Sequence, residues 1–123
     1  MEGVVTLFQY PSQLAELKAN PSLAANFVEE LCRFHTGSAL AMKRVAKVDV
    51  EIGGVTVRAG EGVIASNQSA NRDADIFANP DEFDMHRKWG KEDALGFGFG
   101  PHRCIAEPLA KAELIAVFCM SPG

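Results

Sequence analysis

Apolar residues in the first third of the chain recur at the spacing of amphipathic helices. Residues 12–19, SQLAELKA, follow Tyr10-Pro11, open on a capping serine and carry two leucines at helical spacing. From residue 22 to residue 34, apolar side chains return every three or four positions, at Leu23, Phe27, Leu31 and Phe34. The pattern predicts a short helix over 12–19, which Asn20-Pro21 ends, and a longer amphipathic helix over 22–34.

From residue 44 onward the pattern changes to the alternation that is typical of strands. The run RVAKVDVEIGGVTVRAGEGVIAS places β-branched residues at alternate positions on both sides of Gly53-Gly54. A glycine pair between two such runs favours a tight hairpin turn. We therefore expect a small antiparallel unit of two or three strands over residues 44–64.

The last two segments differ in regularity. Residues 67–95 carry Asn, Pro, Asp and Gly among scattered aromatics, which predicts an irregular segment with one helical turn. Residues 105–118 are apolar at many positions and predict a final helix that is buried on most faces. Because Pro108 has no N–H and crowds the preceding turn, this helix should start late rather than run unbroken through Cys104.

Length and composition place these elements in one folded unit. The chain has 123 residues, a formal net charge of −4 and 47% hydrophobic residues, which is enough for one core. We expect a single unit over residues 1–123, mainly α with a small antiparallel β unit (α+β). The apolar run near the N-terminus and the CMSPG end indicate an incomplete domain whose ends continue elsewhere.

The charge pattern and the cysteines argue against several classes of protein. Basic residues form no run longer than a pair, which gives no reason to expect nucleic acid as a partner. No stretch is long and apolar enough to predict a membrane span, and no signal peptide is indicated. Three cysteines at wide spacing, Cys32, Cys104 and Cys119, do not predict a disulfide framework, so we expect a soluble intracellular protein.

The loop GFGFGPHRCIAEPLAKAEL, residues 96–114, carries the densest chemistry of the chain. Its glycines are spaced G-x-G-x-G rather than G-x-G-x-x-G, and no Gly-Lys-Ser/Thr is present, which disfavours dinucleotide and phosphate loops. A zinc site would lack paired ligands, and His102 lies too near Cys104 in the sequence to act readily as the base of a cysteine hydrolase. A simple buried thiol is the remaining alternative.

The surroundings of Cys104 favour a thiolate. It stands just before the predicted final helix and next to His102 and Arg103, and both a helix N-terminus and nearby cations stabilise a thiolate. Phe97 and Phe99 are close enough in the sequence to exclude water from the sulfur. Haem is the common cofactor that needs a single cysteine, because the porphyrin supplies four further ligands.

These residues resemble the haem loop of the cytochrome P-450 family. Phe97, Gly100, His102 and Cys104 match F-x-x-G-x-[HR]-x-C-x-G, with Ala106 in place of the last glycine. The resemblance implies a haem b cofactor with Cys104 as the axial ligand of the iron.

Two further motifs of the family stand in the expected order. ELCR, Glu30 to Arg33, resembles the E-x-x-R helix, and NPDEFDMHR resembles the P-x-x-F-x-x-x-R segment that ends here at Arg87. The resemblance implies that Glu30, Arg33 and Arg87 form a buried ion-pair triad beneath the haem. Taken alone, each of the three is as readily an ordinary surface charge.

The resemblance also implies roles for other residues around the cofactor. Phe97, Gly98 and Gly100 are expected to lie against the porphyrin, and His102 and Arg44 to donate to its propionates. The run ANRD resembles a family segment in which Arg72 and Asp73 fix the loop. The candidates for the distal pocket and an NADH channel are Ser38, which is also a weak catalytic candidate, Lys43 and Arg44.

Within the family, the runs LKANPSLAANFVEELCR, SALAMKR and HRCIAE resemble the fungal nitric-oxide-reducing branch. The resemblance implies a soluble cytoplasmic enzyme, monomeric at full length, that reduces nitric oxide to nitrous oxide with NADH as the direct electron donor. One alternative is a monooxygenase that acts on an organic compound with electrons from a separate redox partner. Another is a truncated, non-catalytic product, since the resemblance covers about residues 4–118 and only the C-terminal third of the family. For the same reason, a mitochondrial location is a further alternative to the cytoplasm.

Overall fold

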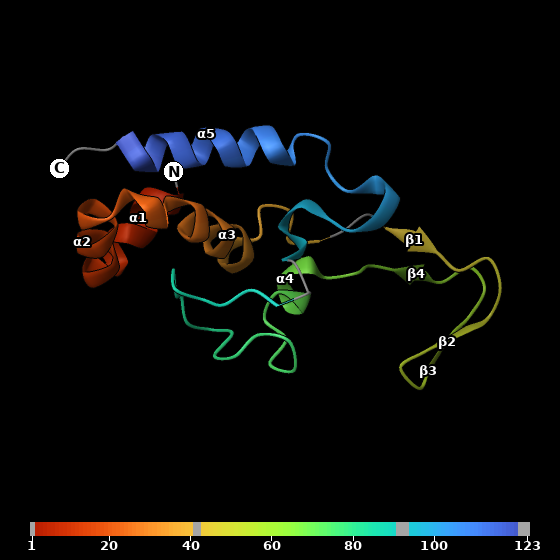
Figure 1. Ribbon diagram of the computed structural model, residues 1–123. Helices are drawn as coiled ribbons and strands as arrows, with labels where there is room; N and C mark the ends of the chain where they lie inside the picture. The colour runs from red at the N-terminus through yellow and green to blue at the C-terminus, as the bar shows by residue number, and fades with distance from the viewer. Residues whose placement is uncertain (1, 41–42, 91–93, 121–123) are drawn as a thin grey trace.

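Helices form one group in this protein, and short strands extend away from it (Figure 1). The computed structural model describes residues 2–40, 43–90 and 94–120. Residues 41–42 of the SALAMKR run and residues 121–123 of the CMSPG end lie outside the described residues. The α-helices are α1 (Glu2–Gln9), α2 (Pro11–Ala19), α3 (Ala24–His35), α4 (Asn67–Ala70) and α5 (Glu107–Met120). Three short 3-10 turns are η1 (Pro21–Leu23), η2 (Leu95–Phe97) and η3 (Gly100–His102).

Helix α2 begins one residue before the predicted start. Pro11 takes the first helical position, where a missing N–H leaves no hydrogen bond unmade, and Tyr10 is an N-cap without a side-chain bond. Ser12, the expected cap, therefore lies inside the first turn, and that part of the prediction is wrong.

The longer predicted helix over 22–34 is divided between η1 and α3. The Asn20 side chain accepts from the backbone N–H of Ser22 and so caps η1. Helix α3 then runs to His35 and ends at Thr36, whose φ of +45° is left-handed.

The hydrophobic core lies where α3 meets α1, α2, α5 and the segment after α4. Phe27 is fully buried at its centre, with the Phe83 and Phe118 rings packed edge-on at centroid distances of 5.6 and 4.8 Å. Burying one such ring stabilises the fold by about 1.5–3 kcal/mol. The other buried members of this core are Leu7, Leu17, Ala24, Val28, Leu31 and Met85.

Helix α5 is exposed along most of its length, so the prediction that it is buried on most faces is wrong for the described residues. It lies across the helical group and packs on α3 through one face, on which Phe118 is buried (Figure 1). Leu109 and Val117 keep 64% and 57% of their surface exposed, because no element among the described ranges covers the opposite face. Its start at Glu107 puts Pro108 in the first turn, as the late-start prediction requires.

The strands form two separate two-stranded antiparallel sheets rather than one unit of two or three strands. β2 (Val50–Ile52) pairs with β3 (Val55–Val57) across the expected turn, where Gly53 and Gly54 have φ of +57° and +79°. β1 (Arg44–Val45) pairs with β4 (Gly62–Val63). This second pairing brings the strand that begins at Arg44 beside the segment that leads into α4.

The observed elements confirm the α+β class, with helices dominant. Residues 67–90 contain one short helix, α4, as expected, and otherwise follow an irregular path; residues 91–93 of the predicted segment lie outside the described residues, and η2 begins at Leu95. None of the helices in the described part of the chain has the length and apolar character needed to cross a bilayer.

Candidate functional site

The loop from Leu95 to Cys104 is held in a fixed shape by its own backbone. The Cys104 N–H donates to the Phe97 carbonyl at 2.9 Å, and the Arg103 N–H donates to the Gly100 carbonyl at 3.0 Å. Gly98 and Gly100 have φ of +80° and +76°, a left-handed conformation that a side chain at either position would strain. The glycines are therefore needed for the path of the loop.

Cys104 lies just ahead of α5. Its carbonyl accepts from the Glu107 N–H at 3.2 Å, and the helix begins at that residue. The positive end of the α5 dipole therefore lies close to Cys104 along the chain.

Beside this loop is a cavity of about 550 Å³, here called the loop cavity. Its size falls in the range of pockets that hold small molecules and cofactors. Six of the predicted site residues line it: Ser38, Arg44, Phe97, Gly98, His102 and Cys104. The remaining lining residues are Val63, Ala65, Asn67, Gly96 and Phe99. Two predicted residues, Lys43 and Gly100, do not belong to the lining.

The lining of the loop cavity favours a ligand that is largely apolar and carries an anionic group. Val63, Ala65, Phe97 and Phe99 supply apolar surface, and none of the lining residues is an aspartate or glutamate. Arg44 lies at one part of the lining and is exposed, with its Nη1 donating to the Lys43 carbonyl at 3.2 Å. A guanidinium that makes one neutral hydrogen bond has further donors for an anionic partner.

The structure brings together the three residues of the predicted triad. Glu30 is fully buried, and its Oε2 accepts from Arg33 Nε at 2.8 Å and from Arg87 Nε at 2.9 Å. Its Oε1 accepts from Arg33 Nη2 at 2.7 Å and from the Asp84 N–H at 3.0 Å. Two guanidinium groups thus share one buried carboxylate, an arrangement in which each charge depends on the others.

The two arginines of the triad also organise the irregular segment after α4. Arg33 donates to the carbonyls of Asn71, Pro80 and Glu82, at 2.7, 2.8 and 3.1 Å. Arg87 donates to the carbonyls of Ala78, Asn79 and Glu82. The two arginines therefore pair backbone carbonyls of a segment that has little regular structure.

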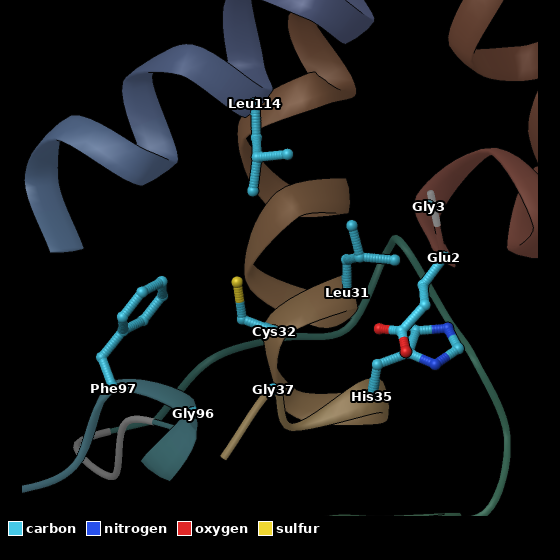
Figure 2. A pocket seen from close by; sticks show the side chains of 9 residues that line it. All are labelled: Glu2, Gly3, Leu31, Cys32, His35, Gly37, Gly96, Phe97 and Leu114. Carbon is cyan, nitrogen blue, oxygen red and sulfur yellow. The ribbon is translucent and has the colours of Figure 1, made fainter. Parts of the chain in front are cut away.

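Only one of the three cysteines is suited to act as an anionic ligand. Cys32 points into a second cavity of about 470 Å³, here called the helix cavity, between Phe97 and Leu114 (Figure 2). Burial raises the pKa of its thiol to about 11, so it is neutral at physiological pH. Cys119 lies near the end of α5 and donates to the Pro21 carbonyl at 3.3 Å. Cys104 alone lines the loop cavity.

An ion-pair network connects the loop to helices α5 and α3. Arg103 donates from both Nε and Nη2 to Glu107, at 2.5 and 2.7 Å, and Lys111 contacts Glu107 at 2.7 Å and Glu29 at 2.8 Å. The Arg103 hydrogen bond, with help from Lys111, lowers the pKa of Glu107 to about 2. Burial opposes the charge of Lys111, but its hydrogen bonds to both carboxylates outweigh burial and raise its pKa. The Lys111 ammonium also lies 5.7 Å from the centre of the Phe97 ring.

Sequence reasoning missed two residues that hold the loop. Asn71 is fully buried, and its Oδ1 accepts from the Leu95 N–H at 2.7 Å. Gly96 lies so close to α3 that an added Cβ would stand 2.8 Å from the Cys32 carbonyl oxygen. Asn71 lies within the ANRD run, but that run does not reveal that its amide reaches a loop 24 residues away.

The network around Lys111 and Glu107 was also missed, although its spacing offered a signal. Glu107 and Lys111 are four residues apart on one helix, which is the separation of a favourable ion pair. Glu29 joins them from α3, a contact that only the packing of α5 on α3 brings about.

Comparison with known proteins agrees with this geometry. The family model for Cytochrome P450 matches residues 13–120. The chain is 73% identical to Cytochrome P450 55A3 of Fusarium lichenicola over 116 residues, which is 94% of this chain and 28% of that protein. It is 47% identical to Cytochrome P450 105A3 of Streptomyces carbophilus, over 91% of this chain and 27% of that one.

Solved structures show the same likeness. The crystal structure of CYP105P1 in complex with filipin I is 43% identical, with a TM-score of 0.86, over 95% of this chain and 29% of that one. Cytochrome P450 MoxA from Nonomuraea recticatena is 48% identical, with a TM-score of 0.86, over 95% of this chain and 28% of that one. The chain thus spans less than a third of the length of these relatives. Since the family model covers most of the chain and the fold matches solved members, the chain belongs to the cytochrome P450 family.

Proposed function

We propose that this chain forms the thiolate side of the haem pocket in an oxidoreductase that reduces nitric oxide to nitrous oxide with NADH. The observation that carries the proposal is the loop cavity, in which Cys104 is joined by Arg44 and His102 and by no carboxylate. The 73% identity to Cytochrome P450 55A3, together with the three residue runs that resemble the nitric-oxide-reducing branch, supports the choice of reaction.

The residues of the loop cavity fit haem. A thiolate at Cys104 is a suitable axial ligand for iron, and Phe97 offers an apolar surface next to it. At Gly98 and Gly100 no atom lies within 4 Å of where a Cβ would stand, so the glycine backbone leaves open space that a flat group can approach. Arg44 and His102 have the donors that two carboxylates of a porphyrin require.

Haem, when bound, supplies the iron that binds nitric oxide and passes electrons to it. This chain's own residues hold and orient that group. Cys104 would supply the sulfur ligand to the iron, and it stands just ahead of the start of α5. Arg44 and His102 fix the edge of the group through its carboxylates.

Ser38 is the proposed distal-pocket residue, whose hydroxyl would donate to bound substrate. Its backbone carbonyl accepts from the Asn67 side chain at 3.2 Å, which holds this residue at the rim of the loop cavity. Lys43 lies outside the lining but is exposed and directly precedes Arg44 in the sequence, and we propose that Lys43 attracts the phosphates of NADH while Arg44 holds the carboxylates of the bound group.

The proposed reaction is balanced without a further protein. Two molecules of nitric oxide, one NADH and one proton give one nitrous oxide, one NAD⁺ and one water, and the hydride supplies both electrons. We propose accordingly that the enzyme is a soluble, cytoplasmic monomer that needs no electron-transfer partner. The proposed binding partner is therefore a small-molecule substrate, nitric oxide, rather than another protein.

A second candidate is a monooxygenase that takes electrons from a redox partner. Relatives that are 45% and 47% identical carry the names Vitamin D3 dihydroxylase, from Streptomyces griseolus, and Nocardicin C N-oxygenase, from Nocardia uniformis subsp. tsuyamanensis. These identities are well below the 73% shared with Cytochrome P450 55A3, which favours the first proposal.

Stopped-flow mixing separates the two candidates. The haem-loaded protein, expressed from its own gene, is mixed with NADH and nitric oxide in the absence of any reductase. The proposal predicts rapid loss of NADH absorbance with one nitrous oxide formed per NADH, and no NADH loss when dioxygen replaces nitric oxide. NADH oxidation that appears only after a ferredoxin and its reductase are added would contradict the proposal and favour the monooxygenase.

A further inference from the structure

Asn71 is a buried polar residue whose amide oxygen, amide nitrogen and backbone groups each have a hydrogen-bond partner. It has no exposed surface, its amide Oδ1 accepts from the Leu95 N–H at 2.7 Å, and its Nδ2 donates to Thr36 Oγ1 at 2.9 Å. Its backbone N–H donates to the Asn67 carbonyl at 2.9 Å, and its carbonyl accepts from Arg33 Nη1 at 2.7 Å. Hydrogen bonds at both the oxygen and the nitrogen of the amide indicate a fixed side chain.

On one side, Asn71 is held by the end of α3. Thr36 is a β-branched residue with φ of +45°, a strained conformation that surrounding contacts must maintain. Its hydroxyl donates to the Arg33 carbonyl at 2.8 Å and accepts from Asn71. Arg33 of the triad thus holds the backbone carbonyl of Asn71, and Thr36 holds its side-chain amide.

On the other side, Asn71 reaches the first residue of the cysteine loop. Leu95 begins η2, and the next residue, Gly96, lies against the α3 backbone beside Cys32 (Figure 2). Phe97 ends η2, and its carbonyl accepts from the Cys104 N–H. The hydrogen bond from the Leu95 N–H to Asn71 Oδ1 therefore connects the buried network to the loop that contains Cys104.

We propose that Asn71 is a positioning residue for the Cys104 ligand, and that its amide anchors the cysteine loop to the triad. The inference rests on the proposed function, because it takes Cys104 to be the haem ligand. An asparagine suits the position because one amide both accepts from Leu95 and donates to Thr36, whereas a carboxylate has no donor. Without the Asn71 amide, the loop loses its hydrogen bond at the Leu95 N–H, and the Cys104 sulfur would be held less firmly as a ligand.

The test compares Asn71→Ala with Thr36→Val in the haem-loaded protein expressed from its own gene. Thr36→Val disturbs the same buried network but leaves the Leu95 contact in place. The measurement is the reduced, carbon-monoxide-bound Soret spectrum, in which a thiolate ligand gives a red-shifted band. The rate at which the red-shifted band converts to the unshifted band reports loss of the thiolate, and it is independent of the amount of folded protein.

Asn71→Ala should convert about five times faster than the wild-type protein or more, the change expected from one hydrogen bond. Thr36→Val, which removes a partner of the amide but keeps the Leu95 hydrogen bond, should accelerate the conversion less than Asn71→Ala does. Equal acceleration in both variants, or none in Asn71→Ala, would overturn the inference while leaving the proposed function intact. A wild-type protein without any red-shifted band would instead show that the proposed function fails, and the inference with it.

If Asn71→Ala does not fold, amide exchange in the wild-type protein decides. The Leu95 N–H should exchange as slowly as the amides of α3, because a buried acceptor holds it. Exchange at the rate of an open loop amide would overturn the inference.

Discussion

Replacing Glu30 by glutamine tests the energetic role of the buried triad. The change keeps the size of the side chain but removes its charge, and it weakens the contacts with Arg33 and Arg87, whose distances are 2.7–2.9 Å. Arg33 has no exposed surface and Arg87 has 9%, so two cations would be left buried without their counter-charge. Loss of one partner from a buried ion pair costs about 3–5 kcal/mol.

This cost is a large part of the stability of an ordinary domain, which is about 5–15 kcal/mol. The assay is urea unfolding of the haem-loaded protein, followed by far-UV circular dichroism. The matched control is Glu16→Gln, because Glu16 also contacts a basic side chain, His86 at 2.6 Å, but both side chains are 51% exposed. The control should lose no more than about 1 kcal/mol. Equal losses in the two variants would refute the reasoning that burial makes the triad indispensable.

Two further predictions concern the loop and its support. Gly96→Ala should lower haem occupancy, because its Cβ would stand 2.8 Å from the Cys32 carbonyl oxygen and backbone cannot yield as a side chain can. Gly62→Ala, which meets no atom within 4 Å, is the control, and equal occupancy in both variants would contradict the prediction. Because the pKa of Glu107 is held at about 2, below its ordinary 4.5, its ion pair stabilises the fold fully above pH 4.5 and progressively less as the pH falls toward 2. Thermal unfolding of wild-type and Glu107→Gln proteins should therefore differ most above pH 4.5, and a difference that persists unchanged to pH 2 would contradict the assignment.

Local chemistry explains why much of the fold could be predicted from the sequence. The three- and four-residue spacing from Leu23 to Phe34 is found in α3 and the turn before it, and Gly53-Gly54 forms the expected hairpin. The late start of α5 follows from one residue, Pro108. In each case the deciding interaction lies within a few residues along the chain.

The features that could not be predicted depend on contacts between distant segments. The exposure of Leu109 and Val117 is set by what packs on α5, which its apolar sequence does not reveal. The contact of Asn71 with Leu95 and the close approach of Gly96 to Cys32 each join separate elements. Residues of the loop that ends at Cys104 could be named in advance because their order forms a motif, whereas the residues that support the loop form none.

The red-shifted Soret band of the reduced, carbon-monoxide-bound protein tests most directly whether Cys104 is the ligand of the haem iron. Three samples are needed: the wild-type protein, Cys104→Ala, and Cys119→Ala, in which the altered cysteine lies near the far end of α5. We expect the red-shifted band in the wild-type protein and in Cys119→Ala, and its complete loss in Cys104→Ala. A red-shifted band that survives in Cys104→Ala would contradict the account.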